Sequence, residues 1–209
     1  MHRRKALIGM VATVGAMLAA TAAYAATITG TSGPNTLTGT PQSDTIRGLG
    51  GADRIRGLGG SDRIDGGTGG DTIDGDGVCP TGTTGAPYYC VPGNPGNDRV
   101  KGGRGDDRIN GNARNDRLDG DSGNDRISGS SGNDRIGGGS GRDIVSGSNG
   151  NDRISGGSGR DRILGGSGND RISARDRTRD TIDCGRGRDT VTADRIDRIA
   201  RNCERIRRR

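Results

Sequence analysis

The chain has 209 residues, of which 43 are glycine and about 1% are aromatic, and it contains neither phenylalanine nor tryptophan. This composition excludes an ordinary globular core of this length, because too few large apolar side chains are available to fill one. The net charge is +6, and nearly all the basic residues are arginines.

Residues 1–25 are typical of a secretory signal peptide. A basic start, Arg3 to Lys5, precedes an apolar run from Ala6 to Ala20, and Ala23-Tyr24-Ala25 fits the small-residue cleavage rule. The apolar run is short for a membrane span, and no later segment is as apolar. We therefore expect a secreted, extracellular mature chain without a membrane span.

Residues 26–74 begin a nine-residue repeat. Asn35 and Asp44 are in phase, but Pro34 and Pro41 interrupt the glycine pattern, so we expect residues 30–47 to be an N-terminal cap rather than a metal site. More regular copies follow, with aspartates at Asp53, Asp62 and Asp71.

Residues 75–92 interrupt the repeat with a segment rich in proline and threonine. The interruption has the length of two repeats, and it therefore forms either one further coil of the fold or an inserted loop. The composition favours the loop. Cys79 and Cys90 flank the segment, and an exported chain permits them to form a disulfide.

Residues 93–173 carry the repeat in its most regular form. Each copy opens on glycine at position 1, places aspartate at position 6 and has an aliphatic residue at position 8. The aspartates are Asp98, Asp107, Asp116, Asp125, Asp134, Asp143, Asp152, Asp161 and Asp170.

The pattern of each copy predicts a short strand and a turn. Position 8 lies between outward-facing positions 7 and 9, which gives a three-residue strand with one core side chain. The glycines of positions 1 to 6 permit a tight turn whose carbonyls converge. Carbonyl and carboxylate oxygens are the ligands that Ca²⁺ prefers, whereas Zn²⁺ prefers nitrogen and sulfur.

This sequence resembles the RTX, or hemolysin-type, calcium-binding family, whose repeat is G-G-x-G-x-D-x-U-x. The resemblance implies an all-β, right-handed parallel β-roll with two repeats in each coil and Ca²⁺ held between turns two repeats apart. Asp98, Asp116, Asp134, Asp152 and Asp170 would then lie on one side, and Asp107, Asp125, Asp143 and Asp161 on the other. The twelve aspartates at position 6 from Asp53 to Asp170 are candidate calcium ligands.

Residues 174–209 depart from the repeat. The aspartate spacing lengthens to ten at Asp180 and returns to nine at Asp189. Ile196, Ile199, Cys203 and Ile206 are spaced as on one face of a helix, so we expect a short capping helix with a basic tail. A disulfide between Cys184 and Cys203 would hold this small C-terminal cap on the last coils.

The sequence offers little for catalysis. The only histidine, His2, lies in the signal segment, and the four cysteines are better suited to pairing than to nucleophilic attack. The aspartates repeat at equal spacing in every turn, unlike the paired carboxylates of a glycosidase cleft. We therefore expect no enzymatic activity. With so thin an aliphatic core, we also expect the chain to be largely unfolded without calcium.

Arginine at position 7 forms a second regular series. In a parallel roll, Arg99, Arg117, Arg135, Arg153 and Arg171 would stand side by side, which leaves two interpretations. The row is either a solvated face balanced by carboxylates such as Asp65 and Asp119, or a binding stripe for an anionic cell-wall or extracellular polymer. The lack of aromatic side chains argues against a specific nucleic-acid partner.

The sequence thus predicts a secreted calcium-binding protein with a structural or adhesive role outside the cell. The alternatives are an accessory or toxin-related module of a secreted enzyme or hemolysin system, and a polyanion-binding surface protein.

Overall fold

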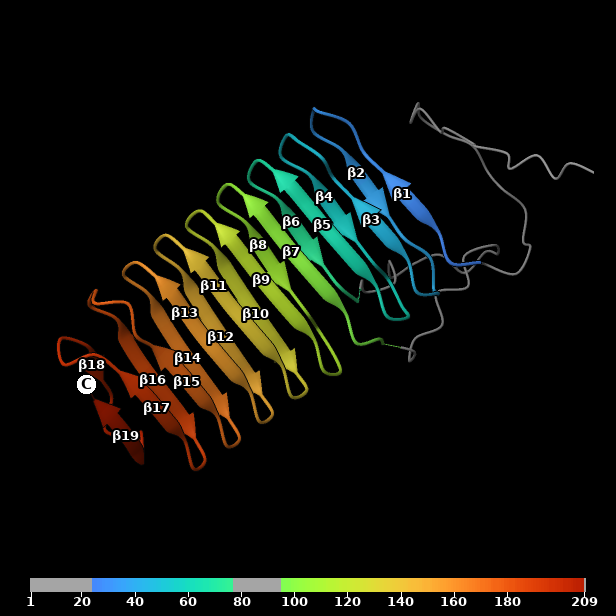
Figure 1. Cartoon of the computed structure of the whole chain (residues 1–209). Coiled ribbons are helices and arrows are strands. Elements are labelled where there is room, and N and C mark those ends of the chain that lie inside the picture. The colour runs from blue at the N-terminus through green and yellow to red at the C-terminus, as the bar shows by residue number, and fades with distance from the viewer. Residues whose placement is uncertain (1–23, 77–94, 209) are drawn as a thin grey trace, which may run out of the picture.

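The computed structural model describes residues 24–76 and 95–208. Within these segments the chain forms a parallel β-solenoid of about nine turns, with strands as its only regular secondary structure apart from turns and bends (Figure 1). The prediction of an all-β parallel roll is confirmed.

Two parallel sheets form the two walls of the roll, because successive strands alternate between them. In spatial order the first sheet contains β1 (Thr27–Thr29), β3 (Thr45–Arg47), β5 (Arg63–Thr68), β7 (Arg99–Arg104), β9 (Arg117–Ser122), β11 (Arg135–Ser140), β13 (Arg153–Ser158), β15 (Arg171–Ala174), β17 (Thr190–Ala193) and β19 (Arg205–Arg208). The second contains β18 (Arg198–Ile199), β16 (Thr181–Arg186), β14 (Arg162–Ser167), β12 (Ile144–Asn149), β10 (Arg126–Ser131), β8 (Arg108–Asn110), β6 (Thr72–Asp74), β4 (Arg54–Arg56) and β2 (Thr36–Thr38).

The register of the sheets follows the repeat directly. Two nine-residue copies make one coil, so residues 18 apart are Cα partners, as Leu118 is of Ile136 and Arg117 is of Arg135. Position 8 of each copy enters the core, where side chains such as Ile127, Val145 and Ile163 are almost fully buried. The core is therefore a narrow stack of aliphatic side chains contributed by both sheets.

The turns between the sheets need residues with positive φ at positions 2 and 4. Gly103 and Gly105 show the usual case, with φ of 109° and 130°. A Cβ on Gly105 would collide with the carbonyl oxygen of Gly69 in the preceding coil. Glycine at position 4 therefore lets consecutive turns approach each other closely.

The segment inserted after residue 74 leaves the register unchanged. β5 pairs directly with β7, with Arg63 opposite Arg99, and β6 pairs with β8, with Thr72 opposite Arg108. Among the described residues, no further strand lies between β5 and β7 or between β6 and β8. Residues 77–94, including the proposed Cys79–Cys90 pair, lie outside the described residues.

The prediction of a C-terminal helix over residues 194–206 is wrong. Ile199 lies in β18 opposite Ile182, and Ile206 lies in β19 opposite Val191. The backbone N–H of Arg198 donates to the carbonyl of Asp180, at 2.8 Å. The roll therefore continues through β19, because these strands pair with the backbone of β16 and β17, which a helix would leave unpaired.

The change in spacing before Asp180 is absorbed in a turn. Thr181 pairs with Arg162, so this coil is longer than the regular ones, and the strands keep their order. Asp176 occupies the longer turn and accepts hydrogen bonds from the backbone N–H of Gly159 and of Thr178, at 2.6 and 2.8 Å. The added length therefore changes the turn and leaves the sheets intact.

The predicted disulfide between Cys184 and Cys203 is present, with the two Cα atoms 5.2 Å apart. Both cysteines are buried. The bond links β16 to the segment between β18 and β19, and so fastens the last coil to the body of the roll.

Candidate metal centre

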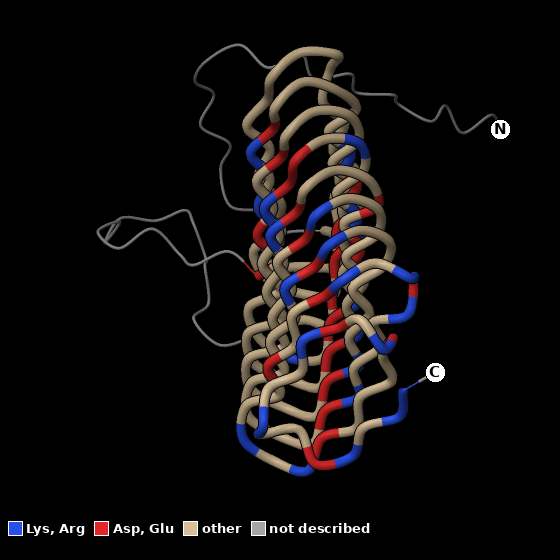
Figure 2. Tube along the Cα trace, turned by 90° about the vertical axis from the view of Figure 1, so that its left-hand side faces the viewer, with Lys and Arg blue, Asp and Glu red and all other residues tan. Residues whose placement is uncertain are grey.

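The aspartates of position 6 form two columns inside the turns. All twelve candidate ligands are at most 3% exposed, although each carries a carboxyl group. The Oδ1 atom of each accepts a hydrogen bond from the backbone N–H of the residue at position 6 one coil earlier, as Asp116 does from Asp98 at 2.8 Å. That residue is Asn35 for Asp53 and an aspartate for the others. Figure 2 shows acidic positions aligned along the roll, beside columns of basic positions.

The two columns have the membership that the repeat predicts. The same hydrogen bond joins Asp98, Asp116, Asp134, Asp152 and Asp170 in one column. It joins Asp107, Asp125, Asp143 and Asp161 in the other. The same hydrogen bond also joins Asp53 to Asp71, Asp71 to Asp107 and Asp62 to Asp98. Both columns therefore include aspartates from before and after the inserted segment.

The second carboxylate oxygen, Oδ2, has no hydrogen-bond partner in any of these twelve side chains. A buried carboxylate without a partner on one oxygen is costly, because that oxygen has lost its water without replacement. A row of such oxygens therefore indicates a ligand that accepts their lone pairs.

Each Oδ2 faces a small space beside the glycine of position 1, which we call the cradle. A Cβ built on Gly66 would lie 2.5 Å from Asp71 Oδ2 and 2.5 Å from the carbonyl oxygen of Gly102. The same pair of oxygens recurs at Gly111, where the Oδ2 belongs to Asp116 and the carbonyl to Gly129. Glycine thus keeps open a space that a carboxylate and a carbonyl of the next coil both face.

Burial raises the pKa of these carboxyl groups, and neighbouring aspartates of the same column raise many of them further. The pKa of Asp116 rises to about 8, first through loss of water and then through Asp98 and Asp134. That of Asp107 rises to about 7 and that of Asp152 to about 6, again mainly through burial. At neutral pH the ionised carboxylates therefore need a positive charge close by.

The donor set fits a hard cation that takes backbone oxygens. Among the described residues, no three carboxylate, histidine or cysteine side chains gather where they could hold one ion. A cation in the turns would therefore combine carboxylates with carbonyls, which is a set suited to Ca²⁺ and unsuited to Zn²⁺.

The cap expected at residues 30–47 forms ordinary rungs, but its two in-phase side chains differ from the others. Asp44 Oδ2 accepts the backbone N–H of Thr40, and Asn35 Oδ1 accepts that of Thr31, at 2.6 Å. Neither leaves an unpaired carboxylate oxygen. The expectation that residues 30–47 hold no metal stays a prediction.

Two further aspartates join the columns, and the sequence reasoning did not include them among the candidate ligands. Asp180 and Asp189 are fully buried and have an unpaired Oδ2. Their signal was an aliphatic residue two positions later, Ile182 and Val191. Position 1 of their copies carries Ala174 and Cys184 in place of glycine, so a Cβ occupies the space that is open elsewhere.

One turn inside the regular region is also altered. Arg114 takes the place of the glycine at position 4 and adopts a φ of 76°, whereas Gly105 and Gly123 have φ of 130° and 142°. A side chain at positive φ is strained, and the turn differs in shape. The cradle near Arg114 is therefore the least regular one in residues 95–173.

The arginines of position 7 stand in register, as predicted. Arg99, Arg117, Arg135, Arg153 and Arg171 are Cα partners in succession along the first sheet, and all are exposed. In the second sheet Thr72 and Ile144 interrupt the corresponding series. We call the first series the arginine row.

Comparison with family models supports this picture. Residues 29–64, 47–77, 92–121, 110–145 and 146–175 match the model of the RTX calcium-binding nonapeptide repeat, which spans four copies. The chain belongs to the RTX calcium-binding nonapeptide-repeat family. The matches cover more than half of this RTX chain and include all twelve candidate ligands. A comparison with curated proteins found no match.

RTX repeats bind calcium as a family, and the cradles show how this RTX chain could do so. The aspartate columns provide carboxylate oxygens, and the glycines of position 1 provide both space and carbonyls. Calcium bound here would supply positive charge among the buried carboxylates.

Proposed function

We propose that this chain is a secreted structural or adhesive protein whose roll is stabilised by Ca²⁺ held at the aspartate columns. The observation that carries the proposal is the row of buried Oδ2 atoms without partners, each beside a cradle. Within residues 95–173 each consecutive pair of aspartates in a column would hold one ion, which gives about seven ions.

The proposal that folding depends on calcium rests on two features that both weaken the fold without metal. The narrow aliphatic core buries little apolar surface for so many ordered residues. Burial, and then repulsion between aspartates of one column, disfavours the ionised carboxylates and raises the pKa of Asp116. A cation between them removes this repulsion, so binding and folding are coupled.

A calcium titration followed by far-ultraviolet circular dichroism tests this function. We expect little β structure in chelator and a cooperative gain as Ca²⁺ is added. Calorimetry of the full chain should report about seven ions from residues 95–173 together with those held by Asp53, Asp62 and Asp71. Mg²⁺ is the matched control, because it demands a smaller octahedral site and keeps its waters. A spectrum that does not change across the calcium titration would contradict the proposal.

The proposed site of action is outside the cell. The composition of residues 1–25 supports export, and RTX repeats are typical of secreted proteins. No helix in the described part of the chain has the length and apolar character needed to cross a membrane.

The proposed role is not catalytic. The aspartates repeat along the whole roll and do not converge in a cleft, and the only histidine of the sequence is His2. Two hollows on the described surface are shallow strips along the sheets, lined mainly by strand residues. These features favour a structural or adhesive protein over an accessory or toxin-related module of an enzyme system.

A further inference from the structure

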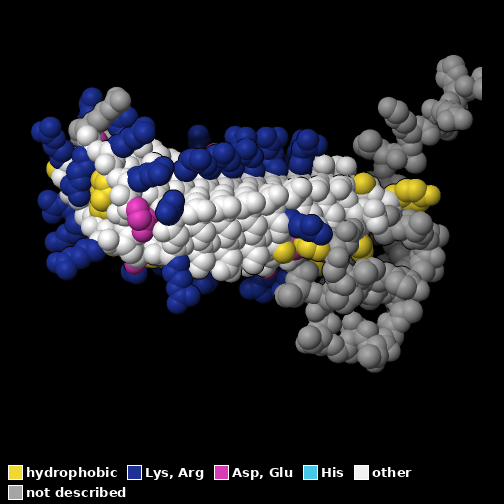
Figure 3. All heavy atoms as spheres, turned by 90° about the horizontal axis from the view of Figure 1, so that it is seen from below, with side chains coloured by type: hydrophobic (Ala, Val, Ile, Leu, Met, Phe, Trp, Pro, Cys, Tyr) yellow, Lys and Arg dark blue, Asp and Glu magenta, His cyan; other side chains and the backbone are white. Residues whose placement is uncertain are grey.

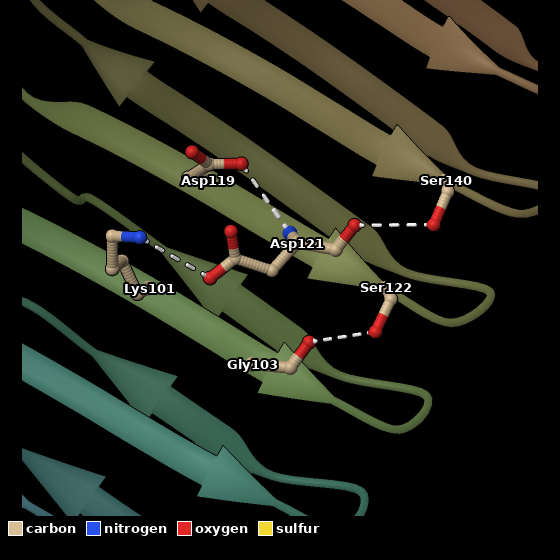
Figure 4. Close-up of polar contacts among 6 residues, drawn as sticks. All are labelled: Lys101, Gly103, Asp119, Asp121, Ser122 and Ser140. Carbon is tan, nitrogen blue, oxygen red and sulfur yellow. Dashed lines mark hydrogen bonds and ion pairs between the residues drawn. The ribbon is translucent and has the colours of Figure 1, made fainter.

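The arginine row has no partner for its charge among the described residues. Those residues contain a single ion pair, between Lys101 and Asp121, whose atoms are 3.6 Å apart (Figure 4). Asp119, which the sequence suggested as a counter-charge, lies beside Asp121 and accepts its backbone N–H at 3.3 Å. The acidic groups at this end of the row therefore interact with each other and with Lys101 rather than with the arginines.

A second row of donors runs next to the arginines. The asparagines of position 5 in the same repeat copies as these arginines are exposed, and the Oδ1 atom of each accepts the backbone N–H of the residue one coil later, as Asn115 does from Asn133 at 2.6 Å. This leaves the Nδ2 groups without a hydrogen-bond acceptor among the described residues. We call this series the asparagine row; it contains Asn97, Asn115, Asn133, Asn151 and Asn169.

Along the opposite edge of the roll the corresponding series of side chains is interrupted. There the residues of position 5 include Asp106, whose carboxylate accepts hydrogen bonds from Asn124, at 2.7 Å to its backbone N–H. Ile144 interrupts the arginines of position 7. Uninterrupted rows of both donors thus occur along one edge only, beside β7, β9, β11, β13 and β15.

A shallow groove follows the arginine row along the first sheet. It measures about 380 Å³, and the side chains of Arg117, Arg135, Arg153 and Arg171 line it. Its other side begins at Asp119 and continues with small residues, Gly137, Ser155 and Ser173. Figure 3 shows basic side chains gathered in a line along the molecule, with few acidic ones among them.

We propose that this groove binds a linear acidic polysaccharide lengthwise. Coils stacked about 4.8 Å apart present one guanidinium per rung, which suits a polymer that carries one carboxylate on each sugar. Guanidinium groups bind carboxylates through paired hydrogen bonds, while Asn Nδ2 and the serine hydroxyls suit sugar hydroxyls. A nucleic acid is a poorer match, because no aromatic side chain lines the groove to stack on bases.

The inference rests on the proposed function, because it names the partner of the adhesive role. It also predicts that calcium strengthens binding of the polysaccharide. The aspartates of position 6 point inward, away from the arginine row. Each Ca²⁺ carries two positive charges and each carboxylate one negative charge, so about one ion for each carboxylate makes the interior of the calcium-loaded roll more positive. The potential at the groove rises with it.

Two triple variants of the calcium-loaded full chain test the inference. The first changes Arg117, Arg135 and Arg153 to Thr, and the control changes Arg108, Arg126 and Arg162 to Thr on the other sheet. Both lose the same charge, and threonine already occupies position 7 at Thr72, Thr181 and Thr190. Binding to polygalacturonate is measured by calorimetry, with dextran, polyphosphate and single-stranded DNA as comparison polymers.

We expect the first variant to bind polygalacturonate about 10- to 100-fold more weakly than the parent chain, and the control to stay close to the parent. Parental affinity should fall steeply as salt rises. Equal loss in both variants, parental affinity in the first, or tighter binding of polyphosphate or DNA would overturn the inference. Circular dichroism of each variant in calcium reports the proposed function separately, so a folded roll that binds no polymer refutes only the inference.

Discussion

Filling one cradle with a methyl group tests the metal centre without removing any carboxylate. Gly66 lies in β5 with a backbone conformation that alanine can adopt, and its Cβ would lie 2.5 Å from both Asp71 Oδ2 and the Gly102 carbonyl oxygen. Ordinary contact begins near 3.4 Å, so both oxygens must move. The change Gly66→Ala therefore fills the space in which we expect an ion and displaces both oxygens, while every carboxylate is kept.

The matched control is Gly137→Ala in β11. Its Cβ would point outward and come no closer than 3.5 Å to any atom, the nearest being Asp119 Oδ1. Replacing glycine by alanine in a strand interior stabilises by about 0.5–1 kcal/mol when space allows. The control should therefore be as stable as the parent or slightly more stable.

The expected cost of Gly66→Ala has two contributions. Overpacking the turn should lower the free energy of unfolding by about 1–3 kcal/mol, with or without calcium. Loss of one ion should remove about 2.7 kcal/mol more when free calcium is a hundred times its dissociation constant. The difference between variant and parent should therefore grow as calcium is raised.

Denaturant unfolding at fixed free calcium, followed by circular dichroism, measures these free energies, and calorimetry counts the ions. We expect Gly66→Ala to bind one ion fewer and to be less stable than Gly137→Ala by several kcal/mol in saturating calcium. Equal stability of the two variants with unchanged ion number would refute the cradle as a calcium site.

Two further predictions concern pH and the disulfide. In chelator, β structure should increase as the pH falls from about 8 towards 4. Burial and neighbouring aspartates raise the folded-state pKa of Asp116 to about 8, whereas its unfolded value is 3.8. The contribution of Asp116 to stability is therefore fully present below the unfolded pKa and is lost as the pH rises through the folded pKa. Circular dichroism against pH measures this, and β structure that increases with pH in chelator would contradict it. Replacing Cys184 and Cys203 by alanine should lower the free energy of unfolding in calcium by about 3 kcal/mol, because their bond closes a chain segment with a sequence separation of 19. Denaturant midpoints compare this variant with the parent, and an unchanged midpoint would show that the bond adds nothing to the last coils.

The regular part of the fold could be predicted because the repeat specifies it locally. An aspartate at position 6 and an aliphatic residue at position 8 determine which way each side chain faces, and Arg117 therefore stands opposite Arg135. The two aspartate columns follow from the same periodicity together with two repeats in each coil, which the family resemblance implied. The direction of each side chain and the membership of each column could therefore be predicted from the repeat and the number of repeats in a coil, without knowledge of other tertiary contacts.

The end of the chain could not be predicted in this way. The spacing of Ile199 and Ile206 fits one face of a helix, but two shortened coils bring the same residues opposite Ile182 and Val191. The open edges of β16 and β17 decide between the two, because they offer backbone partners. Sequence periodicity alone does not include this interaction.

The asparagine row was not predicted either. Asn115 and Asn133 are turn residues by composition, and the hydrogen bond from one coil to the next that orients their amides appears only when the coils are stacked. The absence of ion pairs between the arginine row and other described residues likewise cannot be read from the sequence, because it depends on where the acidic side chains lie in the folded chain. Their nearest acidic neighbours in sequence point inward.

The direct pairing of β5 with β7 has a consequence for how such a chain can change its length during evolution. A gene duplication or deletion of two repeats adds or removes one whole coil, and every residue downstream keeps its sheet. A change of a single repeat would instead exchange the two walls for the rest of the chain, and it would move Arg135, Arg153 and Arg171 to the opposite face. Selection acting on one continuous row of arginines should therefore permit lengthening in steps of two repeats and eliminate single-repeat changes within the row.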